Sequence, residues 1–265
     1  MPVDPNPLNM TGAASPFEDR FGSDFPKAGR VQIPEPKRPF FPRILRALFR
    51  WLFYFIVGSI LLVCVYAVVP VPTTLTMLFD SNGATRDWTS LSNMSPNVVR
   101  AAIAAEDSKF CSHDGFDRDA IQKALQRNAK GGKLRGGSTI SQQTAKNVFL
   151  WQGSGYSRYI RKVPEIWFTF LIEQIWGKRR IMEVYLNVAE TGIGTYGMEA
   201  GAQRYFNKSA KDLSRVEAAR IIATLPLPKK RAVNGATGFT RRYGNSISSR
   251  TGVVDRAGLD SCIYK

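Results

Sequence analysis

EDSKFCSHDG, residues 106–115, and RGGSTISQQTAKN, residues 135–147, are the two stretches that decide how this chain is organised. Both follow a single apolar run near the start of the chain, at Trp51–Val69. Together they place a carboxylate, a glycine-rich helix start and several cations in one short region that must lie close to a membrane. This combination indicates chemistry on a lipid-linked anion.

The first stretch ends a predicted helix. Ser95 is a good N-cap and Pro96 suits the first helical position, and apolar residues then recur at spacings of three and four up to Glu106. Glu106 therefore shares a face with apolar side chains, which would raise its pKa and make it a better proton acceptor. The alternative is an acid near a helix end that simply reaches water.

The second stretch predicts a helix at Thr139–Phe149, with Ser138 as its N-cap after Gly136 and Gly137. Backbone amides at such a start can hold an anion. The order of residues differs from that of a nucleotide P-loop.

Three side chains of this helix are candidates for binding. Lys146 is a candidate phosphate ligand. Gln142 and Gln143 could bind sugar hydroxyls, but hydrogen bonds between helices explain them equally well.

A further helix is predicted to open at Arg161–Glu165, where Pro164 fits only the first turn. Arg158, Arg161 and Lys162 form either a solvated face or, with Lys146, a clamp for phosphate oxygens. Glu165 would lie beside the positive end of the helix, where complementing the helix dipole is its simplest role. Trp151, Tyr156 and Tyr159 lie among these cations, as residues of an interfacial surface or as core filler.

Composition supports a membrane-anchored protein with an anionic partner. The chain has 265 residues and a formal net charge of +16. The run Trp51–Val69 is long enough to span a bilayer, and a basic flank precedes it, which predicts a cytoplasmic N-terminus and an exported remainder. The proline-rich segment 1–42 is predicted to be a disordered cytoplasmic tail. Nucleic acid is not an expected partner of an exported domain.

The remaining chain predicts a mainly α-helical domain. Helices are expected at Lys178–Asn187 and Met198–Phe206, and after the capping box Ser214/Glu217, whereas no convincing alternating strands occur. From Arg231 onward the sequence is poorly periodic, and its last residues are expected to be loosely held. Asp107 is expected to cap a helix or form a salt bridge, and His113, the sole histidine, to be structural. Cys64 lies in the apolar run, and spacing alone leaves open whether Cys111 and Cys262 pair.

Five motifs in order resemble the family 51 glycosyltransferases, most closely their single-domain biosynthetic peptidoglycan transglycosylases. The resemblance covers about Ser92–Arg231. Besides the two opening stretches, it rests on RKVPE, KRRIMEVYLN and GTYGMEAGAQRYFNK, at residues 161–165, 178–187 and 194–208. No penicillin-binding motif set follows.

The resemblance implies a lysozyme-like helical fold with a membrane-facing lobe that polymerises lipid II on the outer face of the bacterial inner membrane. It implies that Glu106 is the general base and that Glu165 orients or assists the leaving diphosphate. The implied substrate-binding and pyrophosphate-binding residues are Ser138, Gln142, Gln143, Lys146, Arg158, Arg161 and Lys162.

The expected partners are lipid II, the growing glycan strand and membrane lipid, with other cell-wall synthesis or division proteins as further candidates. No protein-held metal site is predicted, although the resemblance leaves room for a divalent cation, Mg²⁺ or Mn²⁺. The expected organisation is a tail, an anchor, a linker, a transglycosylase domain and a C-terminal extension, at 1–42, 43–72, 73–91, 92–231 and 232–265. A glycan-cleaving enzyme of lysozyme type and a non-catalytic cell-wall scaffold are the alternatives.

Overall fold

A computed structural model describes residues 40–129, 137–153 and 155–264. The chain divides at Arg50, and Arg50–Lys265 forms one compact unit. Helix α1 spans Phe40–Val68. Of the preceding unit, Met1–Phe49, the structure describes only the residues that begin this helix. The predicted tail therefore lies outside the described residues up to position 39, and residues 40–42 already belong to α1.

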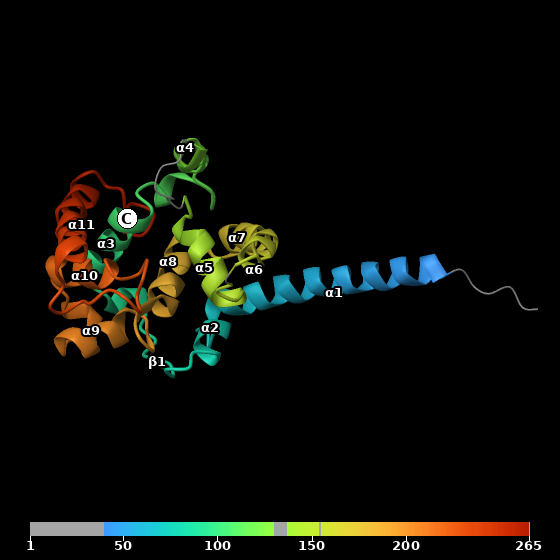
Figure 1. The fold of residues 1–265 in the computed structure, drawn as a ribbon, viewed down its shortest axis with the longest axis horizontal. Coiled ribbons are helices and arrows are strands. Elements are labelled where there is room, and N and C mark those ends of the chain that lie inside the picture. Colours follow the sequence, from blue (N-terminus) through green and yellow to red (C-terminus); the bar gives the residue numbers. More distant parts are fainter. Residues whose placement is uncertain (1–39, 130–136, 154, 265) are drawn as a thin grey trace, which may run out of the picture. The chain divides into compact units, whose positions relative to one another are not determined.

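The compact unit is built mainly from helices (Figure 1). A three-stranded sheet of very short strands has the order β1-β3-β2, in which β1 and β3 are parallel and β2 and β3 antiparallel. The strands are β1 Thr85–Arg86, β2 Glu190–Gly192 and β3 Thr195–Tyr196. The helices after α1 are α2 Leu75–Leu78, α3 Pro96–Glu106, α4 Arg118–Ala129, α5 Ile140–Phe149, α6 Ser157–Ile160, α7 Lys162–Ile175, α8 Gly177–Val188, α9 Met198–Phe206, α10 Arg215–Ile222 and α11 Gly238–Arg256, and 3₁₀ turns occur at Leu91–Asn93, Phe110–Ser112 and Ala210–Asp212.

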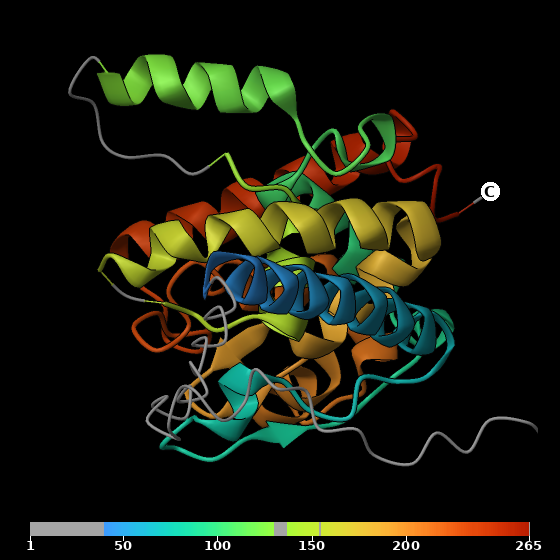
Figure 2. The same cartoon turned by 90° about the vertical axis from the view of Figure 1, so that its right-hand side faces the viewer.

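Pro42–Val68 of α1 is the one helix among the described residues that is long and apolar enough to span a bilayer. The C-terminal part of α1 runs beside α7 (Figure 2). Trp167 donates its indole N–H to Ser59 Oγ at 2.9 Å, and Trp176 donates to the Val63 carbonyl at 2.7 Å. Arg180 donates to the carbonyls of Tyr66 and Val69, which caps the C-terminus of α1 with a cation. The anchor is thus packed against the domain and is more than a tether.

The α6–α7 segment carries an exposed apolar face. Large side chains exposed by at least half are Tyr156, Tyr159, Ile160, Val163, Ile166 and Phe170. Tyr156 is 78% exposed and Tyr159 61% exposed, so both belong to a surface and are not core filler. Apolar residues gathered beside a membrane-spanning helix favour contact with the bilayer interface.

Two groups of helices form the core of the compact unit. In one group, α3 packs against α10 and α11, and its small buried residues Ala101, Ala102 and Ala104 allow close approach (Figure 1). In the other group, α5 packs against α7 and α8. There the rings of Phe149 and Phe168 stack with centroids 4.4 Å apart.

The C-terminal segment is firmly held, which differs from the sequence expectation. Helix α11 buries Ile247 and Val254, and Arg100 of α3 pairs with both Asp255 and Asp260 at 2.8 and 2.7 Å. Residues 232–265 therefore belong to the compact unit. Contacts distant in sequence hold this helix, and a local pattern could not reveal them.

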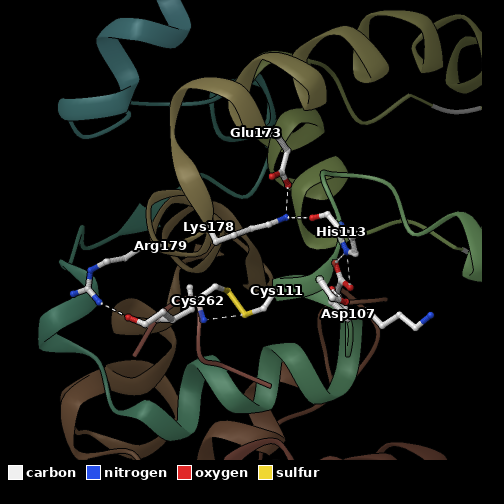
Figure 3. Close-up of a disulfide and its surroundings, with 10 residues drawn as sticks. Asp107, Cys111, His113, Glu173, Lys178, Arg179 and Cys262 are labelled. Atoms are coloured by element: carbon white, nitrogen blue, oxygen red, sulfur yellow. Dashed lines mark hydrogen bonds and ion pairs between the residues drawn. A yellow bond between two sulfur atoms is a disulfide. The ribbon is translucent and has the colours of Figure 1, made fainter. Parts of the chain in front are cut away.

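A disulfide joins Cys111 to Cys262, which settles a pairing that spacing alone left open (Figure 3). It ties the loop after Glu106 to the turn after α11. Arg179 of α8 holds the same turn by donating to the Ile263 carbonyl at 3.1 Å. Cys64 is exposed in α1 and unpaired.

The mainly helical fold with one N-terminal candidate membrane helix is confirmed. The predicted caps at Ser95 and at Ser214/Glu217 are present, and α9 has the predicted bounds. Ser138 is not the cap of α5: the cap is Thr139, whose side chain accepts from the Gln142 N–H in a capping box. The three strands were not predicted, because two or three residues are too few to show alternation.

We predict that replacing both disulfide cysteines by serine lowers the stability of the folded domain by about 2–4 kcal/mol, because the unfolded chain loses its cross-link. Thermal unfolding of the detergent-solubilised protein would measure the change. Cys64→Ser is the matched control and should unfold at the wild-type temperature. Equal unfolding temperatures for the wild type and the double variant would contradict the prediction.

Candidate active site

A cleft of about 1380 Å³ opens between the two helix groups of the compact unit. It is lined by the end of α3, the start of α5, the start of α7, the turn after α10 and one side of α11. Its lining residues are Ala105, Glu106, Ser138, Gln142, Gln143, Lys146, Arg161, Lys162, Glu165, Pro226, Leu227, Arg231, Phe239, Tyr243, Ser246 and Arg250.

Glu106 is the last residue of α3, and its side chain is half-buried in this cleft. Its Oε2 accepts from Gln143 Nε2 at 3.0 Å, whereas its buried Oε1 has no hydrogen-bond partner among the described residues. Burial raises the pKa of Glu106, and the bond from Gln143 and the charges of Lys146 and Arg231 oppose that rise. An unpaired carboxylate oxygen of raised basicity is free to accept a proton from a ligand.

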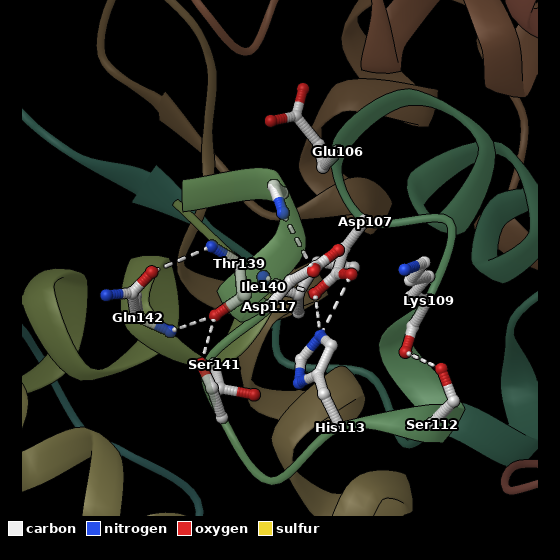
Figure 4. Close-up of polar contacts among 12 residues, drawn as sticks. Glu106, Asp107, Lys109, Ser112, His113, Asp117, Thr139, Ile140, Ser141 and Gln142 are labelled. Carbon is white, nitrogen blue, oxygen red and sulfur yellow. Dashed lines mark hydrogen bonds and ion pairs between the residues drawn. The ribbon is translucent and has the colours of Figure 1, made fainter. Parts of the chain in front are cut away.

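Asp107 fixes the orientation of this region. Its carboxylate accepts from the backbone N–H of Ile140 at 3.1 Å and lies 3.0 Å from His113 Nε2 (Figure 4). Figure 4 shows the Glu106 side chain pointing away from this cluster. Asp107 therefore joins the end of α3 to the start of α5, and both it and His113 have the structural roles predicted from the sequence.

A second set of contacts holds the 106–115 loop against α7 and α8. Lys178 donates to the His113 carbonyl at 2.5 Å and to Glu173 Oε1 at 2.8 Å (Figure 3). Ser141 of α5 donates to the same Glu173 oxygen. Gly115 has φ +86°, and a Cβ there would lie 2.9 Å from Thr169 Cγ2, so a larger residue would push the loop off α7.

Opposite Glu106, α5 and α7 contribute a cluster of cations around one acid. Glu165 is 2% exposed and lies 3.3 Å from Arg161 and 2.5 Å from Lys162. Arg161 is itself buried, whereas the Lys162 side chain is 47% exposed. Glu165 thus holds two cations in place at the wall of the cleft.

Lys146 lies between the acid of α3 and the cations of α7. Its side-chain ammonium makes no hydrogen bond to any residue that the structure describes. Burial lowers its pKa, the positive charges of Arg161 and Lys162 lower it further, and Glu165 and Glu106 oppose the shift. A lysine without a protein partner among like charges is well placed to bind an anion.

The two glutamines make bonds within the protein. Gln142 Oε1 accepts from the Thr139 N–H at 3.0 Å, which completes the capping box. Gln143 links α5 to Glu106. Both still line the cleft with Ser138, so their structural bonds do not remove them from it.

The structure brings together every predicted site residue except Arg158. That side chain is exposed, lies outside the residues lining the cleft and stacks on Tyr159, with its Cζ 5.0 Å from the ring centroid. Gly136, one of the residues predicted to form the anion-binding helix start, lies outside the described residues.

The side of the cleft formed by Arg231 and α11 was not predicted from the sequence. Arg231 lowers the pKa of Glu106, and the Tyr243 hydroxyl donates to the carbonyl of Ala105 at 3.3 Å. Phe239, Tyr243, Ser246 and Arg250 recur at helical spacing, which could have revealed a common face but not the partner of that face.

Comparisons with known proteins agree on one family. The family model described as "Transglycosylase" matches residues 73–251. A "Biosynthetic peptidoglycan transglycosylase" of Caulobacter vibrioides is 47% identical over 228 residues, which cover 84% of this chain and 98% of that protein. Proteins of the same name from Pseudomonas aeruginosa and Pasteurella multocida are 45% and 39% identical, covering 71% and 88% of this chain and 83% and 98% of their own.

We predict that Glu106→Gln raises the unfolding temperature at pH 7.5. Folding raises the pKa of the Glu106 carboxyl, so the ionised carboxylate lowers the stability of the folded state. This loss of stability disappears when the pH falls below the pKa of a glutamate in the unfolded chain, about 4.3. The difference between variant and wild type should therefore shrink from pH 7.5 to pH 4. Each kcal/mol of change in the free energy of unfolding shifts the unfolding temperature by about 2–4 °C for a domain of this size.

Glu165→Gln is the matched control and should have the opposite sign. It leaves the buried Arg161 without its partner, which costs on the order of 3–5 kcal/mol for a buried pair. If both substitutions lower the unfolding temperature by a similar amount at pH 7.5, burial of the Glu106 carboxylate does not destabilise the folded domain.

Proposed function

The chain belongs to the transglycosylase family, and we propose that it is a peptidoglycan glycosyltransferase that polymerises lipid II into glycan strands. The observation that supports this function best is the cleft in which Glu106, with one unpaired oxygen, faces the cation cluster of Lys146, Arg161 and Lys162. A base and a site for a leaving anion are the two elements that transfer from a sugar diphosphate needs.

In the proposed reaction Glu106 takes the proton from the 4-hydroxyl of the acceptor's N-acetylglucosamine. That oxygen attacks the anomeric carbon of the donor's N-acetylmuramic acid from the face opposite the leaving group, so the configuration inverts. The bond from the anomeric carbon to the diphosphate breaks, and undecaprenyl diphosphate leaves with the electron pair. Glu106 then returns its proton to solvent.

The cations stabilise the charge that grows on the leaving diphosphate. The Lys146 ammonium makes no hydrogen bond to the described residues, so it can donate to a phosphate oxygen. Glu165 acts through Arg161 and Lys162, which it holds toward the cleft. Ser138, Gln142 and Gln143 line the same region and offer hydrogen bonds to the sugars.

The donor set of the cleft does not fit a resident divalent cation. Among the described residues no three of His, Cys, Asp and Glu gather as metal ligands. The carboxylate nearest the clamp, Glu165, is already paired with two cations. The proposed mechanism therefore relies on side-chain charges to hold the diphosphate.

We place the domain on the outer face of the bacterial inner membrane, with the N-terminus in the cytoplasm. The basic residues that precede the apolar run of α1 favour this orientation. The disulfide gives independent support, because such bonds persist in an oxidising compartment. The exposed apolar face of α6–α7 beside α1 would rest in the membrane interface, where the lipid-linked substrates and membrane lipid lie.

The cation cluster also argues against the two alternatives. A glycan-cleaving enzyme has no diphosphate to hold, and a scaffold has no use for a carboxylate with an unpaired buried oxygen. Purified lipid II tests all three: elongating polymer supports the proposal, whereas shortened sacculus strands without polymer support cleavage. No reaction with either substrate would support a scaffold.

We predict that Glu106→Gln abolishes polymerisation while binding of lipid II is largely retained. A general base contributes about 10²–10⁴-fold to rate, and the amide keeps the shape of the side chain. Single-turnover polymerisation and binding of fluorescent lipid II would measure the two effects. Turnover within tenfold of the wild type would remove Glu106 from the role of base.

We predict that Lys146→Ala weakens donor binding by about 10- to 100-fold at low salt, because a charged hydrogen bond to phosphate is lost. The difference in donor affinity between this variant and the wild type should become smaller at high salt, because salt screens the contact between Lys146 and the phosphate. Arg158→Ala is the comparison, and a smaller loss is expected because Arg158 lies outside the cleft lining. Equal losses for the two variants would contradict this assignment of the clamp.

A further inference from the structure

The side of the cleft opposite the cation cluster is a continuous stripe on α11. Its residues are Phe239, Tyr243, Ser246 and Arg250, all of which line the cleft. Their spacing of four, three and four places them on one face of the helix, over a length of about 16 Å. We call these four residues the α11 stripe.

The aromatic end of the α11 stripe is held beside the base. The rings of Phe239 and Tyr243 lie 5.7 Å apart at an interplanar angle of 19°, and the Arg231 guanidinium lies 5.1 and 5.7 Å from their centroids. Arg231 is fixed by its bond to the Ala223 carbonyl at 2.7 Å. The Tyr243 hydroxyl donates to the carbonyl of Ala105, the residue before Glu106. These contacts limit ring motion before any ligand binds.

Phe239 nevertheless remains 57% exposed. A large apolar ring that is fixed in place and exposed in a cleft suits a ligand with its own flat apolar face. The CH face of a pyranose ring meets that requirement, and the hydroxyl of Ser246 one turn further along offers a hydrogen bond to a sugar.

Arg250 supplies a charge at the other end of the α11 stripe. Its side chain is exposed, it contacts the Tyr243 hydroxyl, and its bond from Nε to the Ser246 carbonyl is long at 3.4 Å. The remaining N–H groups of its planar fork can pair with a carboxylate. The diphosphate has its own cations on α5 and α7, so Arg250 serves a different part of the substrate.

We propose that the α11 stripe is a binding track for the glycan strand, in which Phe239 and Tyr243 stack on amino-sugar rings and Arg250 pairs with a carboxylate carried by the peptide stem. The inference rests on the proposed glycosyltransferase function and names which part of the substrate this wall holds. The polyprenyl chain is excluded from the track, because the exposed apolar residues that would suit it lie on α6–α7.

Binding of lipid-free glycan fragments to the full-length protein in detergent tests the track. Two probes are compared: a peptidoglycan tetrasaccharide with its peptide stems, and chitotetraose, which carries no carboxylate. Phe239→Ala should weaken both about three- to tenfold. Arg250→Ala should weaken the stem-bearing fragment about tenfold and leave chitotetraose unchanged.

Two exposed residues of α11 outside the cleft lining provide matched controls. Arg242→Ala removes a charge and Val253→Ala removes an apolar side chain, and both should bind the two probes as the wild type does. Phe239→Leu keeps a large apolar side chain but removes the ring. It tests the same loss of stacking if Phe239→Ala fails to fold. Wild-type affinity in Phe239→Ala and Phe239→Leu, or equal loss for both probes in Arg250→Ala, would overturn the proposal.

Polymerisation of lipid II separates this inference from the function on which it rests. Shorter strands from Phe239→Ala than from the wild type and the controls would support the track. If the wild type makes polymer but the variants match the controls in binding and strand length, the track fails and the function stands. If the wild type makes no polymer, the proposed function itself fails.

Discussion

The carboxylate of Asp107 is the constraint on which the cleft depends. The residue Asp107 is 6% exposed, and burial of its carboxylate is tolerable because the carboxylate accepts from the Ile140 N–H and contacts the His113 ring. Glu106 precedes it directly, and Ile140 begins the helix that carries Gln143 and Lys146. One buried side chain therefore sets Glu106, at the end of α3, against Lys146 of α5, and a shift of either helix would break the bond between Asp107 and Ile140.

The second constraint is the packing of α7 between the cleft and the anchor. Arg161, Lys162 and Glu165 occupy its start, and Trp167, only a few residues later, bonds Ser59 of α1. At about 1.5 Å per residue, the clamp lies within about two helical turns of the membrane-spanning helix. The proposed site for a lipid-linked diphosphate therefore lies close to the exposed apolar face of α6–α7, which suits a polyprenyl chain.

What the sequence predicted well is what local rules determine. The caps at Ser95 and Ser214, the bounds of α9 and the membrane helix follow from residue type and periodicity, and the resemblance brought together Glu106, Lys146 and Glu165. Helix α11 was missed because its Gly-, Ser- and Thr-rich sequence has low helix propensity, so distant partners such as Arg100 must stabilise it. The disulfide pairing and the position of Arg231 are likewise set by tertiary contacts.

The electrostatics of Glu106 join the two walls of the cleft. Burial raises the pKa of the Glu106 carboxyl, while the charges of Lys146 from one wall and Arg231 from the other oppose that rise. An anion bound to Lys146 would weaken that cationic field and raise the pKa of Glu106 further. Glu106 would then be a stronger proton acceptor with the anion in place than without it. In the proposed mechanism, one balance of charges would link binding of the diphosphate to the basicity of Glu106, without any movement of the backbone.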